Sequence, residues 1–381
     1  MRIVIAPDSF KHSLTARKVA ESISEGIHNV LPDTETILVP VADGGEGTVQ
    51  SLVDATGGRI EKLKVHDPLM RKTNSFLGML GDDKTAVIEM AAASGIELLN
   101  DNDLDPMIAS TFGTGELMKK ALDLGCYKMI IGIGGSATND GGLGMAKALG
   151  VKFRDAAGNE VGEGGGKLAD ISEIDDSGLD ERLKQCEVLV AADVTNPLTG
   201  ENGATEVYGP QKGANREQVK KLDKNLEHFG RLLYRIYRKD FAVMKGAGAA
   251  GGLGAGLLAF AGARIRHGFD IVAEITNLEE KIIGADLVIT GEGKIDHQTQ
   301  FGKTPFGVAS IAKKYNKPLV AFAGTLGEEY EALYKKGFDV IMPITIKPIP
   351  LREALEKAGP LLRQAAERVA RMYLLSLRLG K

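Results

Sequence analysis

Residues 286–294 read DLVITGEGK, a short apolar run that ends in a polar, glycine-rich segment. The run at 286–290 predicts a buried strand, and Gly291 to Lys294 predict a loop at its end. Strands alternating with helices predict a parallel sheet with helices on both faces. The elements expected after this loop are a helix at 305–315, a strand at 318–323, a helix at 327–336, a strand at 339–343 and a helix at 351–376 broken at Pro360.

The N-terminal segment shows the same alternation. We expect Ser13 to cap a first helix that ends before Pro32, and Gly57-Gly58 to end a second helix. The strands expected here are residues 2–6 (RIVIA) and 36–41 (TILVPV).

The middle of the chain is less regular. The elements expected there are strands at 85–90, 128–133 and 187–192, a hairpin around Gly158, and a long helix at 215–239. A chain of 381 residues exceeds one ordinary core. We therefore predict an α/β protein of two domains. Residues 1–75 and 280–381 form a parallel-sheet domain of the flavodoxin or Rossmann type, and residues 76–279 form an α/β domain inserted into it.

Composition narrows the function. The net charge of −4 and the lack of a Lys/Arg run argue against binding nucleic acid or an anionic membrane. The glycine-rich stretch at 246–263 predicts a loop and a buried helix rather than a membrane span. Two cysteines form no disulfide framework, so we expect a cytoplasmic protein. Glycine accounts for 48 of 381 residues, about twice the usual share, which suits backbone that approaches a ligand closely.

Polar loops follow several predicted strands directly. In open α/β sheets ligands bind outside the carboxyl ends of the strands, so these loops predict a ligand-binding rim. Each loop carries an aspartate that could bind Mg²⁺ or accept a hydroxyl proton, or could simply cap a turn. These aspartates are Asp8, Asp43, Asp140, Asp193 and Asp296, and the candidate cations for a phosphoryl group are Lys11, Lys212 and Lys294.

The loop from Gly134 to Gly142 combines glycines with Ser, Thr, Asn and Asp between a strand and a short helix. Free backbone N–H groups at such a turn suit nucleotide phosphates; the alternative is a turn without a ligand. The same region contains the GxGxxA pattern Gly132–Ala137, with Asp155 about 20 residues on. An NAD(P)-dependent dehydrogenase of a small hydroxy acid is therefore an alternative. No Walker A motif and no HRD or DFG motif is present.

Arg71, which follows Asp67-Pro68-Leu69-Met70, could hold a substrate carboxylate through a bidentate contact. A surface arginine is the alternative.

With these loops identified, the sequence resembles the glycerate kinases of the bacterial class I type. The matching segments are APDSF…SLTA (6–16), PVADGGEGT (40–48), DPLMR (67–71), GTGE (113–116), IGIGGSATNDGG (131–142), ADVTNPLTGENGAT (192–205), YGPQKGA (208–214), GAGAAGGLGAGL (246–257), TGEGKID (290–296) and GKTPFGVA (302–309). His12 stands where that family commonly has glycine, and Lys294 where it commonly has arginine.

The resemblance implies transfer of the ATP γ-phosphoryl group to D-glycerate with Mg²⁺, usually giving 2-phosphoglycerate. It also implies two α/β domains, one of them flavodoxin-like, with the site in the cleft between them. A homodimer is compatible with it.

The resulting hypothesis assigns each candidate residue a role. The nucleotide-binding residues are Gly134, Gly135, Ser136, Thr138, Asn139 and Asp140; the metal ligands are Asp140, Asp193 and Asn196; the catalytic residues are Asp193, Lys11, Lys294 and Asp296; and the glycerate-binding residues are Asp8, Ser9, Asp43, Gly44 and Arg71. Besides the dehydrogenase, a glycerate-binding sensor on an enzyme-like fold stays an alternative.

Overall fold

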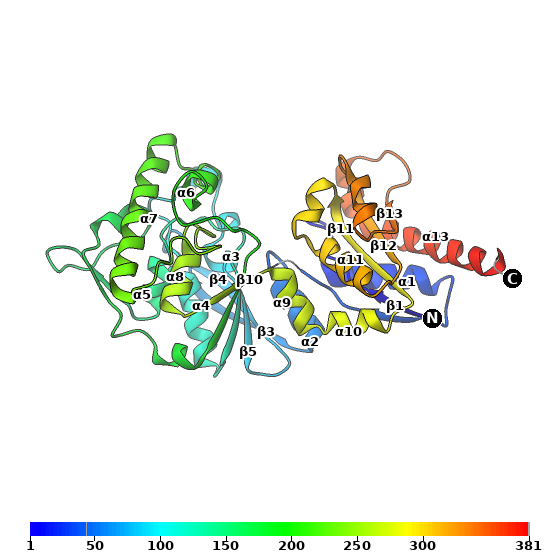
Figure 1. Ribbon diagram of the computed structural model, residues 1–381, viewed down its shortest axis with the longest axis horizontal. Coiled ribbons are helices and arrows are strands. Elements are labelled where there is room, and N and C mark those ends of the chain that lie inside the picture. The colour runs from blue at the N-terminus through cyan, green and yellow to red at the C-terminus, as the bar shows by residue number, and fades with distance from the viewer. Residues whose placement is uncertain (43, 380–381) are drawn as a thin grey trace. The chain divides into compact units, whose positions relative to one another are not determined.

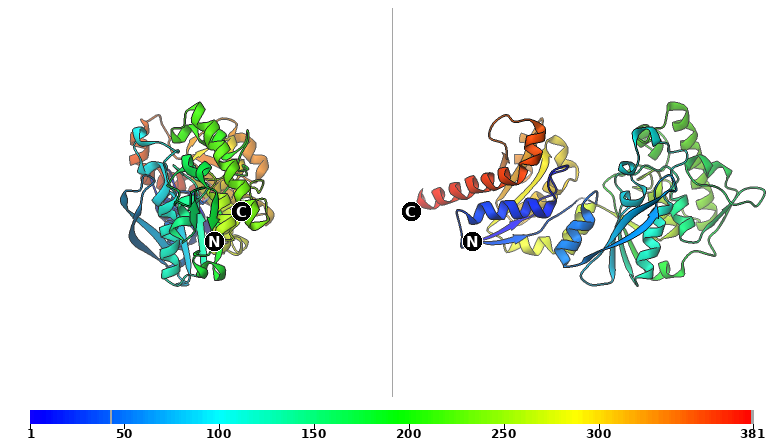
Figure 2. Two further views of the ribbon diagram at one scale, coloured as in Figure 1. Left: turned by 90° about the vertical axis from the view of Figure 1, so that its left-hand side faces the viewer. Right: turned by 180° about the vertical axis from the view of Figure 1, so that it is seen from behind.

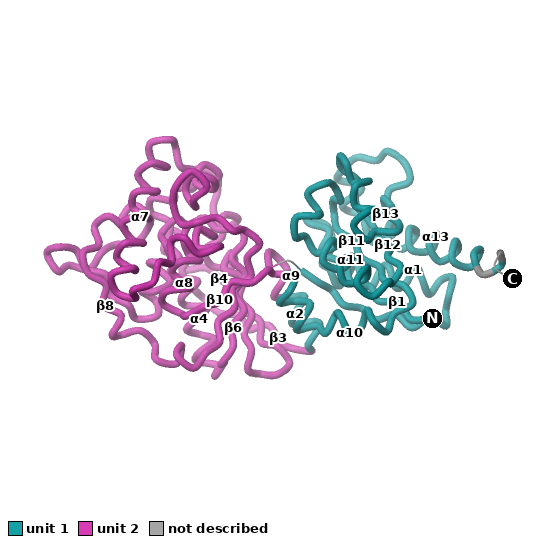
Figure 3. The backbone as a smooth tube through the Cα atoms, viewed as in Figure 1, with its two compact units in different colours: residues 1–43, 50–56, 269–381 teal, residues 44–49, 57–268 magenta. Residues whose placement is uncertain are grey.

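The chain divides into two compact units that alternate along the sequence (Figure 3). The computed structural model describes residues 1–42 and 44–379. Unit 1 comprises residues 1–43, 50–56 and 269–381, and unit 2 comprises residues 44–49 and 57–268. The boundaries expected near residues 75 and 280 fall inside a strand and a helix, β4 (Lys72–Met79) and α10 (Leu278–Ile283).

The sheet of unit 1 is entirely parallel, as predicted. Along the sheet the strands lie in the order β13-β12-β11-β1-β2, so numbered within this unit alone the order is 2-1-3-4-5. That is the strand order of flavodoxin-like folds. The strands are β1 (Arg2–Ile5), β2 (Glu35–Leu38), β11 (Leu287–Ile295), β12 (Leu319–Leu326) and β13 (Val340–Pro343).

Helices cover both faces of this sheet. Two of them, α1 and α13, pack against one face and against each other, while α11 lies on the opposite face (Figures 1 and 2). Gly26 allows this pair to approach closely, because a Cβ there would clash with the carbonyl oxygen of Arg363. The helices of unit 1 are α1 (Ala16–His28), α2 (Thr48–Thr56, begun in unit 2), α9 (Gly268–Ile275), α10, α11 (Thr304–Lys314), α12 (Leu351–Glu356), α13 (Ala358–Leu379) and the 3₁₀ turns η6 (His297–Phe301) and η7 (Tyr330–Lys336).

Four local predictions in unit 1 are corrected. The loop expected at Gly291 to Lys294 is part of strand β11, which continues to Ile295 and pairs with β12. Thr15, not Ser13, caps α1, because its side chain accepts from the N–H of Lys18, while the Ser13 hydroxyl donates to the carbonyl of Leu355 at 2.6 Å. The last helix is interrupted at Lys357, and Pro360 lies in the first turn of α13, where its missing N–H costs nothing. The segment expected as a helix at 327–336 is the 3₁₀ turn η7.

Unit 2 is built on a mixed six-stranded sheet in the order β10-β9-β6-β5-β4-β3. Strands β5, β6, β9 and β10 are parallel, and β3 and β4 form an antiparallel hairpin beside them. The hairpin was not predicted, since the alternating charged residues of β3 are those of a solvated edge strand. The strands are β3 (Arg59–His66), β4, β5 (Thr85–Glu89), β6 (Lys128–Gly132), β9 (Glu187–Ala191) and β10 (Arg264–Arg266), with the separate pair β7 (Lys152–Arg154) and β8 (Glu173–Asp175).

The core of unit 2 contains a cluster of three phenylalanines, Phe153, Phe229 and Phe260, whose ring centroids lie 5.9–6.5 Å apart. The glycine-rich stretch supplies the last of them through α8, which is buried in this core. In the part of the chain that the structure describes, no helix combines the length and the apolar character needed to cross a bilayer. The helices are α3 (Ala91–Ser94), α4 (Phe112–Asp123), α5 (Leu143–Ala148), α6 (Ala204–Tyr208), α7 (Arg216–Tyr237), α8 (Leu253–Phe260) and the 3₁₀ turns η1 (Ile96–Leu98), η2 (Asp101–Asp103), η3 (Gly165–Asp170), η4 (Glu181–Gln185) and η5 (Pro210–Lys212).

The left-handed backbone conformation at the end of α7 can be tested by substitution. Arg238 is exposed, has φ 54° and donates its N–H to the carbonyl of Tyr234. Because glycine adopts this left-handed conformation without strain, Arg238→Gly is expected to raise the free energy of unfolding by about 0.5–1 kcal/mol. Arg235→Gly, one turn earlier and also exposed, should lower it by about 1 kcal/mol. Urea unfolding midpoints measure both; equal effects would contradict the assignment.

Candidate functional site

The loop after β6 lies at the carboxyl end of the parallel part of the unit 2 sheet. Gly135, Gly141 and Gly142 all have positive φ, and Gly142 begins the short helix α5. The polar side chains between them, Ser136 to Asp140, are buried. A plain surface turn would leave such side chains in water, so the loop is folded inwards onto the unit.

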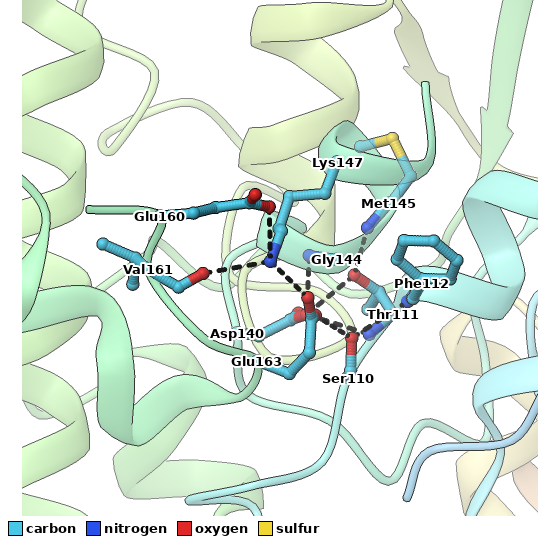
Figure 4. A network of polar contacts seen from close by, with 10 residues as sticks. All are labelled: Ser110, Thr111, Phe112, Asp140, Gly144, Met145, Lys147, Glu160, Val161 and Glu163. Atoms are coloured by element: carbon cyan, nitrogen blue, oxygen red, sulfur yellow. Dashed lines mark hydrogen bonds and ion pairs between the residues drawn. The ribbon is translucent and has the colours of Figure 1, made fainter. Parts of the chain in front are cut away.

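Asp140 is the centre of this packing (Figure 4). Its carboxylate is fully buried and accepts from the N–H and the hydroxyl of Thr111 at 2.9 and 2.8 Å, and from the N–H groups of Gly142 and Gly144 at 3.1 Å. Burial raises the pKa of Asp140, and these hydrogen bonds oppose the rise. The carboxylate joins α4 to α5 and faces protein donors, which does not favour the metal role predicted for it.

Further charged side chains lie close to Asp140 (Figure 4). Lys147 of α5 forms an ion pair with Glu163 at 2.6 Å and donates to the carbonyl of Val161 at 3.0 Å. Glu163 in turn accepts from the hydroxyl of Ser110 at 2.6 Å. These contacts tie the chain after the Gly158 hairpin to α5 and to the start of α4.

Lys212, at the end of η5, is fully buried against the same loop. Its Nζ donates to the hydroxyl oxygen of Ser136 at 2.6 Å and to the carbonyl oxygen of Thr138 at 2.7 Å. Burial lowers the pKa of Lys212 to about 7, and the nearby Asp140 opposes the decrease. The sequence named this lysine as a phosphoryl-binding cation, whereas the structure directs its ammonium group at the loop.

Residues 44–49 approach the same edge of the sheet. Gly132, the last residue of β6, touches the backbone of Gly44 so closely that a Cβ would clash with its carbonyl oxygen. The N–H of Val49 donates to the carboxylate of Glu89, at the end of β5, at 2.8 Å. Burial raises the pKa of Glu89. Asp43, predicted to bind substrate, lies outside the described residues.

Asp193 follows β9 at this edge. One carboxylate oxygen accepts from the N–H of Gly268 at 3.1 Å and lies 3.3 Å from Nδ1 of His267, which follows β10. Asn196 lies further along the same segment, where its amide donates to the carbonyl of Asn202 and accepts from the hydroxyl of Tyr208. Asn196 is thus held in place by protein contacts.

Arg71 is half exposed and paired with acidic neighbours. Its Nε donates to Asp67 at 2.6 Å, and one of its terminal nitrogens lies 3.5 Å from Asp103. Met70 before it has φ 62°. Part of the guanidinium is already committed to protein carboxylates.

In unit 1, Asp8 follows β1 and is held from two sides. Its carboxylate accepts from the N–H of Ser9 at 2.6 Å and from the buried hydroxyl of Thr304, at the start of α11, at 2.7 Å. Nearby on β11, the buried Glu292 accepts from Thr299 at 2.8 Å and from Lys303 at 3.1 Å. Burial raises the pKa of Glu292, and Lys303 opposes the rise.

Lys294 and Asp296, two predicted catalytic residues, form an ion pair of 2.8 Å at the end of β11. The ammonium group lowers the pKa of Asp296, which also caps η6 through the N–H of Gln298. Lys11 is exposed on the loop after β1. His12 beside it adopts φ 63°, so this loop keeps the left-handed conformation with histidine in place of the usual glycine.

Comparison with known proteins agrees with the predicted family. The model of the glycerate kinase family matches residues 3–374. The chain is 48% identical to the glycerate 2-kinase of Escherichia coli (strain K12) over 99% of each chain, and 50% identical to the glycerate kinase of Bacillus subtilis (strain 168) over 100% of this chain and 99% of the other. It also resembles the crystal structure of a protein provisionally named glycerate kinase 2 from Salmonella typhimurium LT2, with 48% identity, a TM-score of 0.91 and 99% of each chain covered.

The chain belongs to the glycerate kinase family. Membership makes it a phosphotransferase that uses a nucleotide and a small-molecule acceptor. The predicted family, the α/β fold and the kinase class are thereby confirmed.

The dehydrogenase alternative finds no support in a glycerate kinase. Asp155, predicted as its ribose-binding carboxylate, is partly exposed and holds the hairpin turn at Gly158 by accepting from the N–H groups of Ala157 and Asn159 at 2.8 and 2.9 Å. The helix after the GxGxxA pattern begins only at Leu143, several residues later than a dinucleotide-binding turn requires.

The polar loops of each unit of this glycerate kinase gather at the carboxyl ends of its own sheet. Two buried acidic residues there, Glu89 and Glu292, were not predicted from the sequence. A charged residue within a glycine-rich segment was the available signal for Glu292. For Glu89 the signal was weaker, namely a charged residue at the end of an apolar strand.

The acidic residues of the strand-end loops do not form a metal cage in the part of the chain that the structure describes. Within residues 1–42 and 44–379, no three or more His, Cys, Asp and Glu side chains are grouped as a metal site. Mg²⁺ that binds with a nucleotide usually takes one or two carboxylates and completes its shell with phosphate oxygens and water. Asp193, partly exposed at the end of β9, meets that need.

The contacts of Asp140 can be tested in the intact glycerate kinase. Asp140→Asn places an amide donor against buried N–H groups, so it should lower the free energy of unfolding by about 3 kcal/mol. Asp155→Asn, in an exposed turn, is the matched control and should cost about 1 kcal/mol or less. Chemical unfolding followed by circular dichroism compares the two. Similar losses would show that Asp140 does not organise the loop.

Proposed function

We propose that this protein transfers the γ-phosphoryl group of ATP to the 2-hydroxyl of D-glycerate, giving 2-phospho-D-glycerate and ADP. The observation that carries the proposal is the similarity, over 99% of each chain, to a protein named glycerate 2-kinase. In the reaction the hydroxyl oxygen attacks the γ-phosphorus, the bond to the β-phosphate oxygen breaks, and the hydroxyl proton passes to a carboxylate.

In unit 2, we propose that the loop from Gly134 to Asn139 binds the ATP phosphates through its backbone N–H groups. Mg²⁺, when bound with ATP, would neutralise developing charge on the phosphates. Asp193 would hold it, with Asn196 orienting the same segment. Asp140 shapes the loop instead of binding the metal, because its carboxylate faces protein donors.

For glycerate, we propose that Asp8 and Ser9 of unit 1 contact its hydroxyl groups. Gly44 and Arg71 of unit 2 would contact its carboxylate, and Asp43 would accept from a hydroxyl group. Three further side chains would act on the phosphoryl group during its transfer, namely those of Lys11, Lys294 and Asp296. Lys294 forms an ion pair with Asp296, so the lysine can hold the carboxylate ionised and ready to accept a proton.

We also infer that the reaction takes place in the cytoplasm, without nucleic acid or membrane as partner. Both cysteines, Cys126 and Cys186, are free and buried, and burial raises the pKa of the Cys186 thiol to about 11. Inert, reduced thiols suit that compartment.

The activity is tested by ADP release with MgATP and four acceptor conditions. D-glycerate should support release, whereas L-glycerate, glycerol and no acceptor should not. A phosphorus NMR spectrum of the product should show the 2-phospho isomer. Absence of glycerate-dependent release would refute the function, and a 3-phospho product would refute only the regiochemistry.

Asp193 provides the sharpest residue test. Asp193→Asn keeps the shape of the side chain and removes its charge, so kcat should fall about 100-fold or more while the fold is retained. Asp240→Asn is the control, because Asp240 lies in the same unit and only accepts from the N–H of Ala242 in an exposed turn. Steady-state kinetics at saturating D-glycerate measures both. A kcat unchanged in Asp193→Asn would exclude the role.

A further inference from the structure

Lys212 is a charged side chain whose hydrogen bonds are donated to one loop. The residue is 1% exposed, and both of its hydrogen bonds reach the loop after β6, one through the Ser136 hydroxyl and one through the Thr138 carbonyl. A buried ammonium group is costly unless hydrogen bonds and an opposite charge offset its loss of hydration. Here the offset comes from these two bonds and from the Asp140 carboxylate.

The loop itself needs this support. Thr138 Oγ1 and Asn139 Oδ1 are buried and, among the residues that the structure describes, have no hydrogen-bond partner. Gly251 and Gly165 press against the carbonyl oxygens of Thr138 and Asn139 so closely that a Cβ at either glycine would clash. Burying polar atoms without partners costs free energy, which other contacts of the loop must offset.

The backbone that carries Lys212 is itself rigid. Pro210 starts η5, and Gly213 after it has φ 96° and packs so closely on the carbonyl of Leu104 that a Cβ would clash. Asn215 then caps the long helix α7 with a complete capping box. The ammonium group is therefore held from a fixed point, and its two bonds transmit that position to the loop.

We propose that Lys212 is a positioning residue, which clamps the Gly134–Asp140 loop from behind in the conformation that binds nucleotide phosphates. It does so through Ser136 and Thr138 and does not contact the phosphates itself. The proposal rests on the proposed function only in naming the nucleotide as the ligand of the loop. The clamp is a separate claim and has its own measurement.

The first measurement is hydrogen–deuterium exchange of the amides of residues 134–142 in the full-length protein. Lys212→Met keeps an unbranched side chain that is one atom shorter and removes both bonds, so these amides should exchange about tenfold faster or more. Strand β6 should keep its protection. Lys281→Met is the control, because it removes a partly buried lysine of unit 1 whose Nζ donates to the carbonyl of Thr276 at 2.7 Å.

The second measurement is the affinity for MgADP by isothermal titration. Lys212→Met should weaken binding about tenfold or more, and Ser136→Ala, a milder change that removes only one bond, about threefold. The double variant should resemble Lys212→Met alone, since both act through one contact. Lys281→Met should leave the affinity unchanged. If Lys212→Met does not fold, Ser136→Ala alone decides the question.

The pH dependence gives a readout that packing alone would not produce. Asp140 is the charged group that faces Lys212, and Ser136 and Thr138 supply its polar contacts. The pKa of Lys212 is lowered from 10.5 to about 7, so above pH 7 the folded protein loses this proton while the unfolded chain keeps it. The contribution of Lys212 to the free energy of unfolding therefore rises between pH 7 and about 10.5. Over the same range MgADP binding should weaken, because Lys212 loses its charge.

Lys212→Met should lose both pH trends. Normal loop protection and normal MgADP affinity in Lys212→Met or Ser136→Ala would overturn the clamp, even in an enzyme that phosphorylates glycerate. Conversely, faster loop exchange in Lys212→Met, in a protein that does not turn over glycerate, would uphold the clamp and refute only the proposed function.

Discussion

The arrangement of unit 2 depends on one buried carboxylate. Asp140 accepts from the backbone and hydroxyl of Thr111 and from the start of α5, so it joins two helices and the loop after β6. If these buried donors had no acceptor, the free energy of unfolding would fall, because each donor would have lost its hydrogen bonds to water without replacing them. Hydrogen bonds to this buried carboxylate thus help to set the position of a loop that is largely polar.

The same design principle appears in unit 1 with different residues. Asp8 is fixed by Ser9 and by the first residue of α11, and Glu292 is fixed by Thr299 and Lys303. Both units thus place an acidic side chain at the carboxyl end of a parallel strand and orient it with hydroxyl or ammonium donors. Oriented carboxylates suit phosphoryl transfer, because little reorganisation is then required during the reaction.

The sequence predicted features that depend on near neighbours. The apolar runs at 2–6, 286–290 and 128–133 predicted the parallel strands, and the polar turns after the first and the last of these runs predicted loops at the strand ends. The loop predicted at Gly291 to Lys294 was wrong, because β11 continues through these residues to Ile295. Features that depend on distant partners escaped prediction. Ser136 and Lys212 are 76 residues apart, and no local pattern reveals that they meet. Likewise, the position of Asp140 in a polar loop predicted a metal ligand, whereas its carboxylate accepts from Thr111, 29 residues earlier.

The strand order of unit 1 also has a consequence for biosynthesis. β1 lies between β2 and β11, so the N-terminal strand finds one of its two partners only after residue 287 has been made. At about 5–20 residues per second, translation leaves β1 exposed on that edge for roughly 15–60 s. Residues 57–268 of unit 2 are continuous and can fold on emerging from the ribosome. The nascent chain can therefore complete unit 2 before unit 1. Until then β1 lacks a partner strand on one edge, which makes it a segment that a chaperone would protect.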